Sequence, residues 1–150
     1  MRIAFDIDGT LTPLGKGQFR CVYLPFPMRL FFREPLREGA RELMCELHAD
    51  GHELWIYTSS LRSKAYLYLW FYFLGVRLDG AVNGDVHSQA LQSRPVKPSK
   101  FPPAFGIDLL IDDSAGVGIE GSRHGFRVLV VDPNDADWIQ KVKTAAQSAA

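Results

Sequence analysis

The chain opens with Ile3-Ala4-Phe5-Asp6-Ile7-Asp8-Gly9-Thr10, an apolar run that ends in two acids and a glycine. The apolar residues predict a buried strand, and the two carboxylates follow where that strand ends. Two like charges this close raise each other's pKa or require a cation between them. An ordinary turn is the alternative interpretation, since Asp, Gly and Thr all form turns. The second acid favours a charged site over a plain turn.

Length and charge restrict the class of protein. The chain has 150 residues, with 17 Lys and Arg balanced by 17 Asp and Glu. This length suits one domain over residues 1–150. A net charge of zero argues against a broad nucleic-acid surface or attraction to an anionic membrane. The apolar run 65–76 is shorter than the roughly 20 residues that span a bilayer. Without a secretory signal before the first strand, and with two cysteines in unrelated contexts, we expect a cytoplasmic protein with reduced thiols.

Apolar runs and helical patterns alternate along the chain. This alternation predicts an α/β fold of Rossmann-like type, a three-layer sandwich whose mostly parallel central sheet has helices on both faces. Strands are expected at 2–5, 53–57, 107–111 and 126–131, with a weaker one at 80–83. Helices are expected at 36–50, at 62–74 and from 137 onward, with Asn134 or Asp135 as the N-cap of the last one.

Residues 11–35 form an irregular insert that is rich in proline and glycine. Segments 19–24 and 28–32 pair as a small hairpin flap in one interpretation, and form a loop packed on the body in the other. The insert also carries several aromatic residues, which ordinary packing explains best, with a roof over the site or a dimer interface as alternatives. These aromatic residues are Tyr23, Phe26, Phe31 and Phe32.

Polar residues follow three of the expected strands. Asp6 and Asp8 follow the first, Thr58-Ser59-Ser60 the second, and Asp112-Asp113 the strand at 107–111. The carboxyl ends of parallel strands lie at one edge of a sheet, and ligands bind just beyond that edge. We therefore expect these acids and hydroxyls to converge. Two lysines, Lys97 and Lys100, precede the strand at 107–111 and are within reach of the same edge.

Several converging carboxylates require a hard cation. Oxygen ligands favour Mg²⁺, which is usually held by one or two carboxylates together with a phosphate. A hydroxyl and a lysine beside that metal predict phosphoryl transfer, in which the protein positions groups and neutralises charge. The acid at the strand end, Asp6, suits the nucleophile of an aspartyl-phosphate mechanism. The second acid, Asp8, suits the general acid and base.

With these four motifs in this order, the chain resembles the haloacid dehalogenase-like (HAD) superfamily of phosphohydrolases over essentially its whole length. The resemblance implies Asp6 as nucleophile and Asp8 as general acid/base. Thr58, with Ser59 beside it, would hold the phosphoryl group, and a lysine would screen the nucleophile and the phosphate. The same resemblance implies that Mg²⁺ is bound by Asp6, the Asp8 carbonyl, Asp112 and Asp113.

Two features differ from a simple match to that superfamily. The active-site lysine is either Lys97 or Lys100, and we favour Lys100 because Pro102 and Pro103 suit the start of a short helix beside it. The chain also lacks room for a full cap domain, which indicates a capless member with a flap at about 11–35. Arg62 is expected on a helix face rather than on the phosphate. His87 is expected to be incidental.

The same motifs also occur in proteins with functions other than phosphate-ester hydrolysis. A signalling receiver domain also forms an aspartyl-phosphate, but it places its paired acids differently along the chain. A catalytically idle scaffold would have no need to keep Asp8. Transfer of the phosphoryl group to an acceptor other than water stays open. The expected partner is a phosphorylated substrate of unknown identity, and a homo-oligomer through the aromatic flap or the helix at 62–74 is a further option.

Overall fold

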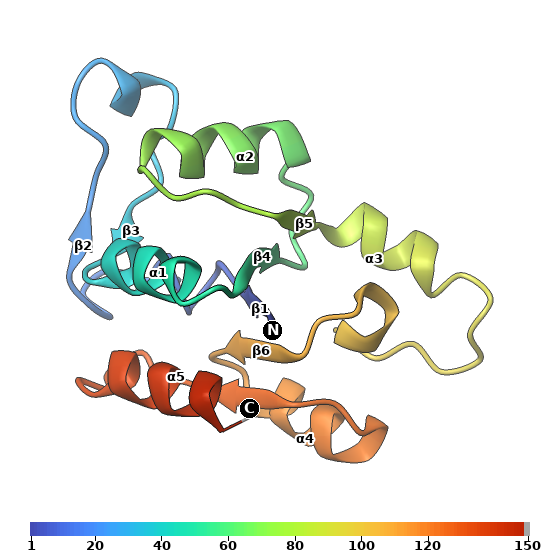
Figure 1. Cartoon of the computed structure of the whole chain (residues 1–150). Helices are drawn as coiled ribbons and strands as arrows, with labels where there is room; N and C mark the ends of the chain where they lie inside the picture. The colour runs from blue at the N-terminus through green and yellow to red at the C-terminus, as the bar shows by residue number, and fades with distance from the viewer. Residues whose placement is uncertain (149–150) are drawn as a thin grey trace.

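The computed structural model describes residues 1–148 and places five parallel strands in one central sheet (Figure 1). The strand order is β5-β4-β1-β6-β7, and every neighbouring pair is parallel. The Rossmann-like parallel sheet expected from the sequence is therefore confirmed. The strands are β1 Arg2–Phe5, β4 Glu53–Tyr57, β5 Gly80–Val82, β6 Leu109–Asp112 and β7 Val128–Val130.

Helices cover both faces of this sheet, which gives three layers. Side chains on β1 alternate between the faces, so Ile3 and Phe5 enter one core and Ala4 enters the other. Helices α1, α2 and α5 pack on the Phe5 face, while α3 and α4 lie on the Ala4 face. The helices are α1 Ala40–Ala49, α2 Lys64–Phe73, α3 Gly84–Ala90, α4 Ala115–His124 and α5 Trp138–Gln147. Within residues 1–148, no helix is long and apolar enough to cross a membrane.

Two expectations about local elements are wrong. The helix expected from 36 begins only at Ala40, because Gly39 has a φ of +79° that a right-handed helix excludes. Leu36–Arg37 instead forms β3, which pairs antiparallel with β2, Cys21–Val22. Asp137, rather than Asn134 or Asp135, stands at the N-cap of α5.

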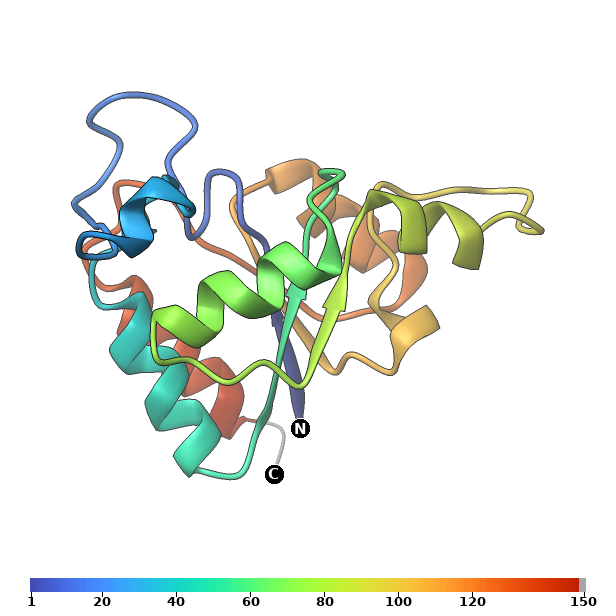
Figure 2. The same ribbon diagram turned by 90° about the horizontal axis from the view of Figure 1, so that it is seen from above.

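Of the two alternatives for the insert at 11–35, the hairpin between 19–24 and 28–32 does not form. Its second half contains a short 3₁₀ helix, η1, Met28–Leu30, and the partner of β2 lies beyond the insert in β3. Figure 2 shows the insert at the same side of the molecule as the carboxyl ends of the strands. Phe32 is buried and packs against α2, as ordinary packing predicts, but Phe26 and Phe31 are 79% and 70% exposed.

Candidate active site

The loop after β1 presents the first two acids of the site. Asp6 continues the sheet pairing, since its amide donates to the carbonyl of Ile111 over 2.9 Å. The chain then turns around the Ile7 carbonyl, which accepts from the amides of Leu11 and Thr12 at 2.9 and 2.7 Å. Ile7 and Leu11 are both fully buried. This anchored turn fixes the backbone on which Asp6 and Asp8 stand.

Gly9 allows that turn to approach the end of β6. Its φ of +93° is a conformation that residues with a side chain rarely adopt. A Cβ at this position would lie 2.2 Å from Oδ2 of Asp113. The absence of a side chain therefore lets the first motif and the last motif come into contact. Thr10 adds a hydrogen bond of 3.4 Å from its hydroxyl to Oδ1 of Asp113.

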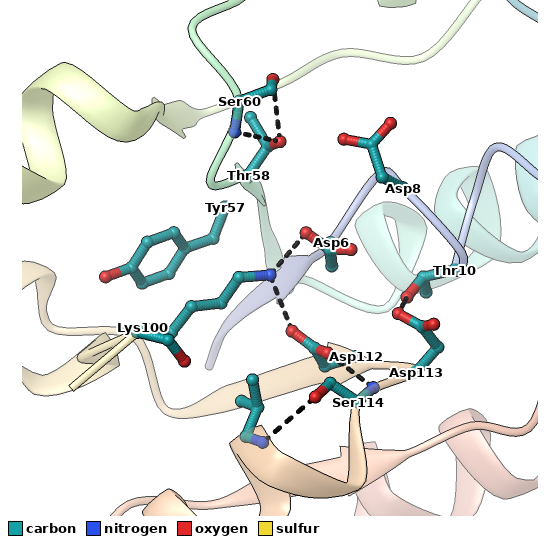
Figure 3. A network of polar contacts seen from close by, with 12 residues as sticks. Asp6, Asp8, Thr10, Tyr57, Thr58, Ser60, Lys100, Asp112, Asp113 and Ser114 are labelled. Atoms are coloured by element: carbon teal, nitrogen blue, oxygen red, sulfur yellow. Dashed lines mark hydrogen bonds and ion pairs between the residues drawn. The ribbon is translucent and has the colours of Figure 1, made fainter. Parts of the chain in front are cut away.

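Asp6, Asp112 and Asp113 form an acidic cluster at this edge of the sheet (Figure 3). They bring carboxylate oxygens within 4.8 Å of one another. Asp112 is held by the Ser114 amide, which donates to its Oδ1 over 2.8 Å at the start of α4. A set of carboxylate oxygens at this spacing suits Mg²⁺, whose preferred ligands are oxygen atoms. The donor set therefore fits the metal expected from the sequence.

Lys100 supplies the positive charge within the cluster. Its Nζ donates to Oδ1 of Asp6 and, over 2.7 Å, to Oδ2 of Asp112. All three side chains are less than a tenth exposed. Lys100 lies just before the short 3₁₀ helix η2, Pro102–Phe105, as expected from the two prolines. Lys97, the other sequence candidate, is exposed on the preceding loop.

Burial dominates the electrostatics of the acids. Loss of hydration raises the pKa of Asp6 to about 6, with Lys100 opposing the rise and Asp112 adding to it. Burial and the charge of Asp112 also raise the pKa of Asp113. One ammonium is thus too little to stabilise three ionised carboxylates in this environment. A divalent cation at the cluster would favour the ionised form of each acid.

A cleft of about 480 Å³ opens onto this cluster. Ser59 lines the cleft, whereas the hydroxyl of buried Thr58 donates to Ser60 Oγ over 3.0 Å. Beside Lys100, the backbone is held by Tyr57, whose hydroxyl accepts from the Phe101 amide over 2.8 Å. The cleft is lined by Asp6, Asp8, Leu14, Ser59, Ser99, Lys100, Asp112, Asp113, Ser114 and Val117.

Asp8 lines the same cleft but points away from Asp6, as Figure 3 shows. Both of its carboxylate oxygens accept from the guanidinium of Arg62, at 2.7 and 2.8 Å. The hydrogen bonds to Asp8 and Glu34 raise the pKa of Arg62 further above its ordinary value. The expectation that Arg62 lies on a helix face is therefore wrong, because it precedes α2 and pairs with Asp8 and Glu34.

Two further groups lie near the site, of which sequence reasoning missed Glu34 and expected His87 to be incidental. Glu34 of the insert pairs with Arg62, and nothing in the spacing of these residues predicts that contact. His87 of α3 lies with Nδ1 2.6 Å from the Tyr57 hydroxyl. Its place after β5, at the carboxyl edge of the sheet, is the one signal in the sequence that pointed to it.

Comparison with known proteins identifies the fold. No family model and no curated protein matches the chain. Among solved structures, a chain of the Pnkp1/Rnl/Hen1 complex is similar with a TM-score of 0.56 and 13% identity over 89% of this chain. This chain spans only 46% of the length of that one.

Two neighbours are matched over nearly their whole length. A predicted phosphatase from Clostridium acetobutylicum has a TM-score of 0.53 and 13% identity, with 99% of this chain and 97% of that chain covered. The HAD domain of effector protein Lem4 from Legionella pneumophila has a TM-score of 0.54 and 16% identity, with 95% and 92% covered. Identities this low establish the fold alone. The chain has the fold of the HAD-like hydrolases.

Proposed function

We propose that this chain is a Mg²⁺-dependent phosphomonoesterase that works through an aspartyl-phosphate on Asp6. The observation that supports this most is the buried cluster of Asp6, Lys100 and Asp112, with Asp113 beside it. A single polar side chain at a strand end is common, but three acids and a lysine meeting below one cleft are costly to bury without a function.

In the first step, an Asp6 carboxylate oxygen attacks phosphorus and the ester P–O bond breaks. The leaving oxygen takes a proton from Asp8, while the Lys100 ammonium neutralises charge on Asp6 and the phosphoryl group. In the second step, Asp8 removes a proton from water as that water attacks the aspartyl-phosphate. The P–O bond to Asp6 then breaks and inorganic phosphate leaves.

The remaining residues hold the phosphoryl group and the metal. Ser59, just after β4, lines the cleft and offers its hydroxyl to the phosphoryl group. Thr58 would join it only by turning its buried hydroxyl away from Ser60. Asp6, Asp112, Asp113 and the backbone carbonyl of Asp8 would hold Mg²⁺. When bound, the ion supplies positive charge that stabilises the phosphoryl oxygens. We take residues 1–150 as one domain that contains this site. Its substrate is a phosphorylated compound, and the residues named here contact the phosphoryl group rather than the leaving group.

The test is hydrolysis of p-nitrophenyl phosphate by the purified chain. We expect phosphate release with Mg²⁺, loss of that release with a chelator, and no turnover by Asp6→Asn. Asp85→Asn, which changes an exposed acid of α3, is the matched control and should keep the wild-type rate. Full activity of Asp6→Asn would remove Asp6 as the nucleophile. Product analysis with added alcohols distinguishes hydrolysis from transfer to an acceptor other than water.

Metal binding has a test that is independent of turnover. Mg²⁺ that binds the folded chain raises the temperature of unfolding, and a tighter-binding site raises it more at the same Mg²⁺ concentration. We expect this increase for the wild type and for Asp85→Asn, but a much smaller one for Asp112→Asn. An equal increase in all three proteins would show that the ion binds elsewhere.

A further inference from the structure

The guanidinium of Arg62 connects the insert to the acid that the proposed function uses as its proton donor. Nη1 and Nη2 each donate to one oxygen of Asp8, at 2.7 and 2.8 Å. Nε donates to the Glu34 carboxylate at 2.9 and 3.0 Å, and Nη2 donates to Glu34 as well. The second hydrogen of Nη1 reaches Ser60 Oγ over 2.8 Å.

These contacts use every donor that the side chain has. An arginine carries five N–H groups, one on Nε and two on each terminal nitrogen. Nε faces Glu34, Nη1 faces Asp8 and Ser60, and Nη2 faces Asp8 and Glu34. In this arrangement none is left to bind a phosphoryl oxygen. The geometry therefore suits a residue that orients Asp8 better than one that binds the phosphate.

Glu34 is itself held from two sides. Besides Arg62, it accepts from the hydroxyl of Tyr66, in the first turn of α2, over 2.8 Å. The Tyr66 ring in turn packs against Phe32 of the insert, with centroids 5.4 Å apart. The backbone of Arg62 is fixed separately, because its carbonyl accepts from the Asn83 side chain over 3.0 Å. Both ends of the Asp8–Arg62–Glu34 chain are thus attached to ordered elements.

The direction in which Asp8 is held matters for proton transfer. In phosphoryl transfer, the attacking and leaving oxygens lie roughly in line on opposite sides of phosphorus. A proton donor for the leaving group must therefore stand away from the nucleophile, across the phosphoryl group. The Asp8 carboxylate points away from Asp6 (Figure 3). The paired hydrogen bonds from Arg62 fix both its direction and the plane of the carboxylate.

We propose that Arg62 is a positioning residue for Asp8, and that Glu34 of the insert holds Arg62 in that role. The inference rests on the proposed function, because it assigns a purpose to the proton donor of that reaction. It gives the insert at 11–35 a part in the chemistry, through one carboxylate, in addition to any part in covering the cleft.

Leaving-group dependence provides the test. p-Nitrophenolate leaves with little help from an acid, whereas the alkoxide of benzyl phosphate needs a proton. We expect Arg62→Ala to lower kcat/KM for benzyl phosphate at least about tenfold more than kcat/KM for p-nitrophenyl phosphate. This ratio reports the first step and leaves out the hydrolysis of the aspartyl-phosphate, which is the same for both esters. Glu34→Gln, a milder change, should show the same bias to a smaller degree. Arg33→Ala, at an exposed arginine of the insert, is the matched control and should show no bias.

A double-mutant cycle separates positioning from direct action on the phosphate. In the Asp8→Asn background the proton donor is already lost, so adding Arg62→Ala should cost little more with benzyl phosphate. Arg62→Lys should not restore the rate, since an ammonium cannot reproduce five donors in one plane. Additive losses, or equal losses with the two esters, would overturn the inference while leaving the phosphatase in place.

The two proposals fail in distinguishable ways. A folded wild type that hydrolyses neither ester overturns the proposed function and the inference with it. An active wild type with unbiased Arg62→Ala and Glu34→Gln variants overturns the inference alone. The network has its own readout in the ¹⁵N resonance of Arg62 Nε, which Glu34→Gln should shift and Arg33→Ala should leave in place. An unshifted resonance in Glu34→Gln would also overturn the inference.

Discussion

Lys100 is a buried cation that pairs with two buried carboxylates. It is 4% exposed and contacts two carboxylates, so its removal leaves Asp6 and Asp112 buried without their cation. We predict that Lys100→Met lowers the free energy of unfolding, measured with urea in the presence of a chelator, by about 3–5 kcal/mol. If the proposed function holds, it should also abolish hydrolysis of p-nitrophenyl phosphate.

Lys97→Met is the matched control for that change. Lys97 is exposed three residues earlier on the same loop, so we expect its replacement to alter the free energy of unfolding by less than about 0.5 kcal/mol. Equal effects of the two substitutions would show that the loop, rather than the ion pair, determines stability here.

Gly9 tests the contact between the first and last motifs. Gly9→Ala places a Cβ 2.2 Å from Asp113 Oδ2 and also requires a positive φ, which costs about 1–2 kcal/mol for a residue with a side chain. We expect a lower free energy of unfolding and a weaker increase in melting temperature with Mg²⁺. Gly15→Ala meets nothing within 4 Å and should change neither quantity. A Gly9→Ala protein with unaltered Mg²⁺ response would show that Asp113 is free to move.

The sequence pattern predicted individual residues well only where the sheet itself places them. Asp6, Asp112 and Asp113 converge because β1 and β6 carry them to one edge of the sheet, and Lys100 reaches the same edge from the loop before η2. Arg62 was assigned to a helix face because its true neighbours, Asp8 and Glu34, depend on the path of an irregular insert. Periodicity contains no information about such a path.

At the scale of elements, the strands were predicted closely because their apolar runs are continuous. β1 and β4 have the expected bounds, while β6 and β7 are shorter than expected. The first helix was predicted to begin too early because Leu36 has the right spacing to the apolar residues of α1. The left-handed backbone of Gly39 prevents the helix from extending back to Leu36. The helices α3 and α4 were not predicted, since their sequences offer a weak apolar pattern.

The start of α2 gives a prediction at this scale. Ser63 is its N-cap and accepts from the Tyr66 amide over 3.1 Å. Ser63→Ala should lower the free energy of unfolding by about 1 kcal/mol, because the amide loses that partner. Ser93→Ala, on an exposed loop, is the control and should have no measurable effect in the same urea titration. Equal stability of both variants would indicate that packing alone fixes this end of the helix.

At the scale of the whole molecule, Tyr57 and His87 join three distant segments. The Tyr57 hydroxyl of β4 contacts His87 in α3 and accepts from the Phe101 amide before η2. Burial lowers the pKa of His87, with a backbone hydrogen bond to Pro98 opposing the change. The unfolded chain therefore binds a proton more readily than the folded one, and the stability contributed by neutral His87 is complete only above about pH 6.5.

This gives a pH dependence that one substitution isolates. As pH falls below about 6.5, the difference in unfolding free energy between wild type and His87→Gln should shrink. The wild-type curve alone is insufficient, because Asp6 titrates over the same range. Burial raises the pKa of Asp6 to about 6, so its protonation as pH falls favours the folded state, whereas protonation of His87 disfavours it. A difference that stays constant from pH 7 to pH 5 would exclude His87 as the source.

Association of the chain stays a prediction at this scale. Tyr68, Leu69 and Tyr72 are at least 40% exposed on α2, and aromatic residues of the insert are exposed as well. Sedimentation velocity at several protein concentrations measures whether the chain associates through these side chains: a sedimentation coefficient that rises with concentration would indicate association.

The sheet is parallel throughout, so all its strands begin on one side of the molecule and end on the other. β1 begins at the edge opposite the cleft, and Arg127, just before β7, donates from that side to the Ala145 carbonyl near the end of α5. Figure 2 likewise shows the start of β1 and the end of α5 close together, far from the insert. A fluorescent group or a chip linkage attached near the start of β1 or near the end of α5 would therefore leave the cleft facing the bulk solution.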